Sequence, residues 1–148
     1  MSLPWPMESL LPHAWPMLLL DDALSHGDDC VATRVTIRPD HPFATSEGVP
    51  GHVGIELMAQ TCGAWAGLNA RKQAEPVRVG YLLGTRRYTV DRSWFRFGDV
   101  LDIQAKLLFR DQGMGVFQCR IMVEGKPVAE AQINVYQPDG DGLEVGDA

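Results

Sequence analysis

The sequence predicts an α+β fold in which a curved antiparallel sheet wraps around one long central helix. One observation is the segment 49–69, extended to about residue 73, which is nearly all apolar or small and reads as a helix buried on most sides. The other is the strand-like alternation of apolar and polar residues before and after this segment. Consecutive strands joined by hairpin turns favour an antiparallel sheet, and a single apolar helix needs that sheet around it.

Length and composition restrict the possible functions. The 148 residues suffice for one domain with a proper core, and the net charge of -6 disfavours nucleic-acid binding. Cys30, Cys62 and Cys119 are odd in number and far apart, which argues against a disulfide framework or a cysteine-based zinc site. The apolar run 17–20 is too short for a membrane span. We therefore expect a cytoplasmic protein without a metal site.

Three regions are expected along the chain. Residues 1–16 carry four prolines and form an N-terminal arm, which cannot be one long helix. Residues 17–137 form a single domain. The Gly- and Asp-rich residues 138–148 are expected to be a disordered acidic tail.

The strands are predicted from period-2 alternation and from turn residues. Two precede the helix, one long strand bent near Gly84 follows it, and three more complete the sheet. Their ranges are 17–26, 30–38, 77–92, 100–110, 114–123 and 127–137. In the strand 100–110 one face carries Leu101, Ile103, Ala105, Leu107 and Phe109, and the other carries Asp102, Gln104, Lys106 and Arg110.

The helix carries the candidate chemistry. His52, Glu56 and Gln60 are spaced four residues apart and share one face. A carboxylate in such an apolar segment loses hydration unless it is paired or lines a wet pocket, so Glu56 is a candidate general acid or base. The alternative is a helix-start carboxylate favoured by the helix dipole. Small residues recur at helical spacing on another stripe, which can therefore lie close against another surface: Ala59, Gly63, Ala66 and Ala70.

One helix inside a curved antiparallel sheet is the hotdog arrangement. In such folds the exposed strand edges usually pair across a two-fold axis, so that no edge is left open. We therefore expect a dimer: a homodimer, or, as the family resemblance given below implies, a heterodimer with a related hotdog subunit.

Three sequence blocks resemble the 3-hydroxyacyl-[acyl-carrier-protein] dehydratases. Residues 11–21 are similar to the opening Leu-Pro-His-x-x-Pro-hydrophobic-Leu-Leu-x-Asp of that family, and residues 50–60 to its Pro-Gly-x4-Glu-x-Met-Ala-Gln helix. Residues 92–101 resemble its later strand and Gly-Asp turn. The blocks occur in the family's order and imply the hotdog fold. Residues 49–60 and 83–88 most resemble the dehydratase-like proteins of aryl polyene pathways.

The resemblance implies four catalytic roles. His41 would be the base, Glu56 the acid, the backbone N–H of Gly51 the donor to the thioester oxygen, and Gln60 the group that orients Glu56. His41 lies one residue further from the Pro-Gly pair than in the family and lacks the His-Phe-Pro-Gly context. The alternative imidazole is His52, one turn before Glu56; the bland alternative for both is a surface histidine.

Binding residues are expected on the helix and on the strand that follows it. Met58, Trp65 and Tyr81 are candidate walls of the acyl tunnel, with ordinary core packing as the alternative. Arg86 and Arg87 belong to a basic cluster with Arg92 and Arg96 that could steer an acidic acyl carrier protein. The alternative for this cluster is a solvated strand face with salt bridges to Asp91 and Asp99.

The resemblance implies dehydration of 3-hydroxyacyl thioesters to trans-2-enoyl thioesters, in fatty-acid or polyene synthesis. The expected enzyme is thus a lyase that needs no cofactor, with its substrate carried on the phosphopantetheine of acyl carrier protein or on CoA. One alternative is a catalytically inactive partner subunit of an active homologue, which the altered loop around His41 favours. Another is a hotdog acyl thioesterase, which uses a carboxylate and a water.

Overall fold

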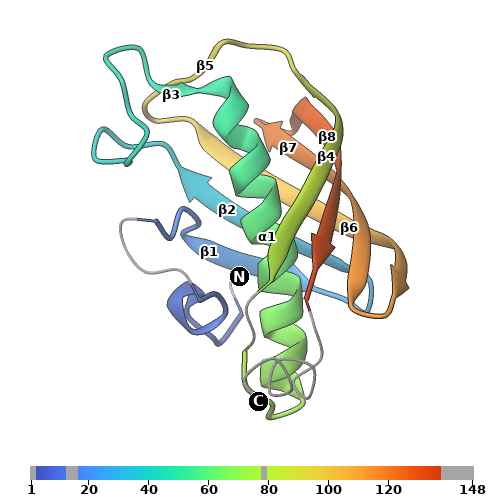
Figure 1. The fold of residues 1–148 in the computed structure, drawn as a ribbon. Helices are drawn as coiled ribbons and strands as arrows, with labels where there is room; N and C mark the ends of the chain where they lie inside the picture. The colour runs from blue at the N-terminus through green and yellow to red at the C-terminus, as the bar shows by residue number, and fades with distance from the viewer. Residues whose placement is uncertain (1–2, 13–16, 78–79, 138–148) are drawn as a thin grey trace, which may run out of the picture.

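A computed structural model describes residues 3–12, 17–77 and 80–137 (Figure 1). The predicted tail 138–148 and arm residues 1–2 and 13–16 lie outside the described residues. Within the described part of the arm, a short 3-10 helix, η1 (Met7–Ser9), is formed.

Six antiparallel strands form one curved sheet that wraps around a single long helix, as predicted (Figure 1). The sheet order is β1-β2-β6-β7-β8-β4, so β1 and β4 form its two edges. The strands are β1 (Asp22–His26), β2 (Cys30–Thr36), β4 (Tyr81–Val90), β6 (Val100–Asp111), β7 (Met114–Val123) and β8 (Lys126–Tyr136). The helix α1 (Gly54–Lys72) crosses the concave face and contacts all six strands.

The helix begins later than predicted. Pro50 belongs to a short strand, β3 (Val49–Pro50), which pairs with β5 (Trp94–Phe95) in a second, two-stranded sheet that the sequence did not reveal. A 3-10 turn, η2 (Gly51–Val53), then leads into α1. The helix begins later because a hydrogen bond holds Gly51 outside it: the Gly51 N–H donates to the Ser93 carbonyl at 2.8 Å.

Other strand ends also shift. The first strand begins at residue 22 instead of 17, because Gln60 holds the backbone at Met17 and Leu19 in place of a strand partner. The second strand ends at residue 36, and β4 begins at residue 81. The predicted bend in β4 is present as register shifts at 82–84 and 86–89.

The core lies between α1 and the sheet. Leu57, Met58 and Leu68 on the helix are fully buried, opposite inward-facing residues such as Phe117 and Ile133. The arm adds buried side chains at residues 7, 10 and 11 and is held by Arg71, whose guanidinium donates to the Ser9 carbonyl at 3.0 and 3.1 Å. No helix within the described residues is long and apolar enough to cross a membrane.

Candidate active site

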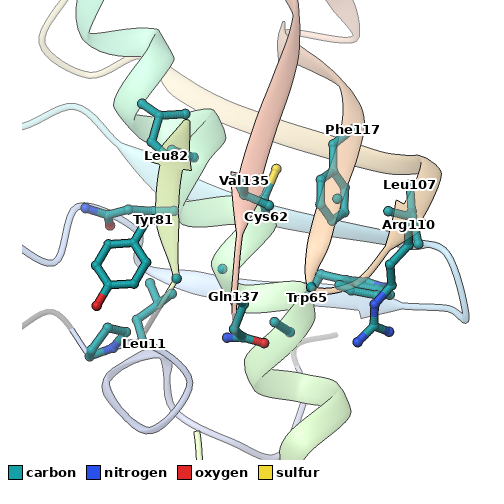
Figure 2. A pocket seen from close by; sticks show the side chains of 18 of the residues that line it. Leu11, Cys62, Trp65, Tyr81, Leu82, Leu107, Arg110, Phe117, Val135 and Gln137 are labelled. Carbon is teal, nitrogen blue, oxygen red and sulfur yellow. The ribbon is translucent and has the colours of Figure 1, made fainter. Parts of the chain in front are cut away.

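A cavity of about 150 Å³ lies between α1 and the sheet (Figure 2). One wall is the small-residue stripe of the helix, where Ala59, Gly63 and Ala66 follow Glu56. The opposite wall comes from the ends of the sheet strands and from the arm. The residues from these segments are Leu11, Pro12, Gly80, Tyr81, Leu82, Leu107, Arg110, Gly113, Gly115, Phe117, Val135 and Gln137.

Glu56 is the carboxyl group of this cavity. It lies half-buried in the first turn of α1, where the unpaired N–H groups of the helix favour a negative charge. No histidine lines the cavity among the residues that the structure describes. The chain therefore brings a carboxyl group, but no described imidazole, to this apolar space.

Gln60 does not orient Glu56, contrary to the prediction. Its side-chain oxygen accepts the Leu19 N–H at 2.9 Å, and its amide nitrogen donates to the Met17 carbonyl at 2.8 Å. Gln60 is 2% exposed. Both ends of the amide therefore bind the backbone that leads into β1.

We expect Gln60→Leu to lower the free energy of unfolding by about 2 kcal/mol, because it leaves the buried Leu19 N–H unpaired. Urea unfolding followed by circular dichroism measures the loss. Gln104→Leu changes an exposed glutamine in the same way and serves as the control. An unchanged midpoint in Gln60→Leu would show that this amide does not hold the segment.

Both backbone polar groups of Gly51 form hydrogen bonds within the chain. Its N–H bonds to Ser93, and its carbonyl accepts the Tyr88 hydroxyl at 2.6 Å. The expected donor to a thioester oxygen is therefore occupied in this structure. Tyr88 was missed in the sequence; its hydroxyl approaches so closely that a Cβ at Gly54 would overlap it.

Burial raises the pKa of Tyr88 to about 12. Above pH 10 the tyrosine of the unfolded chain loses its proton while the folded one keeps it, so stability should fall as the pH rises from about 10 to 12. We expect this fall to be smaller in Tyr88→Phe, when urea unfolding is compared at pH 9 and 11. Tyr81→Phe, at an exposed site, should keep the wild-type fall. An equal fall in Tyr88→Phe would contradict the assignment.

The two predicted imidazoles lie away from the cavity. His41 borders a separate hollow with Leu18, Asp21 and Arg38. Its Nδ1 accepts the Phe43 N–H at 3.1 Å, and burial lowers its pKa against the opposing effect of Asp40 and Asp21. His52 is exposed on η2. The structure therefore does not bring His41 or His52 together with Glu56 in one cavity of one chain.

Of the three predicted tunnel residues, two line the cavity and one does not. Trp65 and Tyr81 lie in the cavity wall, whereas Met58 is fully buried in the core and does not line it. Substrate contact by Trp65 and Tyr81 stays a prediction.

The basic cluster also divides into two parts. Arg92 pairs with Asp91 at 2.7 Å and with Asp99 at 3.9 Å, which matches the salt-bridge alternative. Arg86 and Arg87 are exposed on β4, and Arg87 has a φ of 56° within the strand's second irregularity.

Sequence reasoning missed most of the sheet side of the cavity. One signal was available: Gly115 alternates with Phe117 and Cys119 on the inward face of β7, where a missing side chain leaves space. The contributions of Leu11 and Arg110 could not be found in this way, because they depend on how the arm docks and on a bulge in β6.

A curved antiparallel sheet wrapped around one long helix defines a protein of the hotdog class. A family model described as ApeP dehydratase matches residues 5–145, and the chain belongs to this ApeP-like family.

Two relatives are 3-hydroxyacyl-[acyl-carrier-protein] dehydratases FabZ. The protein from Bartonella quintana is 38% identical over 136 residues, covering 84% of this chain and 83% of that protein. The one from Syntrophotalea carbinolica is 35% identical over 145 residues, covering 87% and 90%.

Solved structures agree with the family and the fold. A chain of the dehydratase heterocomplex ApeI:P from Xenorhabdus doucetiae superimposes with a TM-score of 0.88 at 34% identity, covering 95% of this chain and 96% of that one. A hypothetical thioesterase with coenzyme A from Streptococcus pneumoniae has a TM-score of 0.59 at 15% identity over 78% of this chain and 83% of that one, and shows the fold alone.

Proposed function

We infer that this chain is a dehydratase subunit that removes water from 3-hydroxyacyl thioesters and leaves a trans-2-enoyl thioester. The observation that carries the proposal is Glu56 in the wall of an apolar cavity along the helix, in a chain of the ApeP-like family. Relatives named as 3-hydroxyacyl-[acyl-carrier-protein] dehydratases support the same reaction. As a finer proposal, the substrates are aryl polyene intermediates, because residues 49–60 and 83–88 resemble the dehydratase-like proteins of aryl polyene pathways.

The chemistry needs a base for the C2 proton and an acid for the departing hydroxyl group. Glu56 would protonate the hydroxyl as the C3–O bond breaks, while an imidazole takes the proton from C2. No redox step or electrophilic cofactor is needed, and the substrate arrives on the phosphopantetheine of a carrier protein or on CoA. Arg86 and Arg87, both exposed on β4, would attract an acidic carrier protein.

The imidazole would come from a second hotdog subunit. Among the described residues no histidine lines the cavity of Glu56, and His41 lies by another hollow. The cavity is bounded by β4, which forms one edge of the sheet and exposes Tyr81, Leu82 and Leu83 by 46–53%. Similarity to a chain of a dehydratase heterocomplex favours a related subunit over a second copy.

The test follows the absorbance of the conjugated enoyl thioester. The chain is assayed alone and together with a related hotdog subunit from the same organism. Turnover only in the mixture supports a heterodimeric site, and turnover by the chain alone supports a site formed without a related subunit. Release of free thiol without enoyl product would identify a thioesterase. No turnover in either sample would overturn the proposal of dehydration.

The second candidate, a subunit that only supports an active homologue, is favoured by the cavity without a described imidazole. It predicts that the mixture is active and remains so when Glu56 is changed. The effect of Glu56→Gln in the mixture therefore separates the two candidates.

We expect Leu83→Lys to weaken association with the partner at least tenfold, because a lysine on an edge strand opposes pairing with another strand. Leu83 is 53% exposed in this chain, so the fold should tolerate the change. Analytical ultracentrifugation measures the association. Leu108→Lys, also at 53% exposure but on β6, is the matched control. Equal association of both variants would place the interface elsewhere.

A further inference from the structure

A bulge in β4 turns the side chain of Tyr88 toward the start of α1. The register with β8 shifts between Arg86 and Thr89, so that residues 87 and 88 together oppose one residue of β8. Arg87 takes up the extra length with a φ of 56°, in the left-handed region that is costly for a residue with a side chain. Such strain persists only where the surrounding structure enforces it. The contacts that Tyr88 makes at the helix offset this cost.

The Tyr88 hydroxyl is bound to the backbone at the point where the helix begins. It donates to the Gly51 carbonyl at 2.6 Å, and the Gly54 N–H donates to the same oxygen. Gly54 leaves space for this contact, because a Cβ there would overlap the hydroxyl. Burial raises the pKa of Tyr88 to about 12, so the hydroxyl keeps its proton and remains a donor at neutral pH. Gly51 is thus held at its N–H by Ser93 and at its carbonyl by Tyr88.

Glu56 lies directly after this anchored turn. Gly54 is the first residue of α1 and Glu56 the third, so the position of the carboxyl depends on the backbone that Tyr88 holds. Tyr88 itself does not line the cavity. A misplacement of a reacting group by about 1 Å can lower a rate about 100-fold. A hydroxyl outside the cavity can therefore influence the chemistry inside it without contact with the substrate.

We propose that Tyr88 is a positioning residue for dehydration: its bond to the Gly51 carbonyl sets the first turn of α1 so that the Glu56 carboxyl reaches the leaving hydroxyl group. The proposal rests on the proposed function, in which Glu56 is the acid. No proton passes through Tyr88, and its hydroxyl touches no substrate. Loss of this hydroxyl should therefore slow the chemical step and leave the binding of substrate unchanged.

The test is the steady-state kinetics of Tyr88→Phe in the sample that forms enoyl thioester, whether that is the chain alone or the mixture. We expect kcat to fall about tenfold, less than a full 1 Å misplacement would cost, and KM to change by less than about twofold. An unchanged kcat, or a loss confined to KM, would overturn the proposal while leaving dehydration intact. Absence of turnover with the wild-type chain in both samples would overturn the proposed function, and the positioning role with it.

Thr61→Val separates positioning from a general loss of stability. Thr61 is fully buried on α1, its hydroxyl lies 2.8 Å from that of Thr33 in a hydrogen bond, and it does not line the cavity. The variant removes a buried hydroxyl from the same helix, so it should lower the urea midpoint but keep kcat within about twofold. An equal fall of kcat in Thr61→Val and Tyr88→Phe would show that any weakening of α1 slows the reaction, and would overturn the proposal.

A pair of double variants tests the hydrogen bond itself. A serine in a helix can donate its hydroxyl to the carbonyl three or four residues earlier, and Gly51 is three residues before Gly54. In the Tyr88→Phe chain, Gly54→Ser should therefore give a kcat at least about threefold higher than Gly54→Ala. Both changes bring the same Cβ, which would lie 3.0 Å from the Ile121 Cδ1, so crowding is equal in the two. Equal kcat in two double variants that circular dichroism shows to be folded would contradict the role of this bond.

Discussion

Glu56→Gln should lower the rate of dehydration at least 100-fold. Glutamine keeps the shape and the polarity of the side chain, but it cannot act as the acid that donates a proton to the leaving hydroxyl. General acid–base groups contribute about 10²- to 10⁴-fold to rates of this kind. The measurement is the initial rate of enoyl thioester formation, with this chain in complex with the subunit that completes its site.

The control is Glu47→Gln, which removes an exposed carboxyl in the loop before β3 and should keep the wild-type rate. Circular dichroism and sedimentation of the Glu56→Gln complex exclude loss of fold or assembly as the cause. If the variant kept more than a tenth of the rate, Glu56 would not be the acid. This chain would then serve its partner without chemistry of its own.

The architecture was predictable because it depends on patterns that every element repeats. A helix surrounded by a sheet must be apolar on most faces, and inward strand positions must alternate; the segment that forms α1 and the strands β6 and β7 show both patterns. The start of α1 was not predictable in this way. It depends on the bond between Gly51 and Ser93, residues 42 positions apart in the sequence.

The bulge in β6 shows where alternation fails. Counting by twos places Phe109 on the inward face and Arg110 on the outward face. The extra residue at Leu108 reverses both: Phe109 is 57% exposed, and Arg110 lines the cavity. No glycine or proline marks this bulge in the sequence, so its position is decided by pairing with β7. One cavity residue was therefore assigned to the wrong face.

The sequence placed the predicted site residues on the helix better than those in loops. Helical spacing correctly indicates that Glu56, Gln60 and Trp65 belong to one element, and all three line the cavity. It could not show that Gln60 has both ends of its amide bound to the strand entry. His41 lies in a loop, where the sequence motif carries no information about which cavity the side chain borders.

Gly67→Ala should lower the free energy of unfolding by about 3 kcal/mol. A Cβ at this position would overlap the backbone carbonyl of Leu10, and backbone cannot rotate away as a side chain can. The arm must then shift, which exposes Met7, Leu10 and Leu11, now at most 5% exposed. Burial of one such side chain contributes about 1.5–3 kcal/mol, and alanine returns only about 1 kcal/mol of helix propensity.

Gly63→Ala separates this clash from a general effect of alanine in α1. Its Cβ would approach only the end of the Leu11 side chain, at 2.8 Å, so a rotation relieves the contact and the loss should be under about 1 kcal/mol. Urea unfolding measures both variants, and chymotrypsin cleavage near Leu10 reports release of the arm. Equal stability of the two variants would show that the arm is not seated on Gly67. Because Leu11 lines the cavity, the docking of the arm also decides how this cavity is closed.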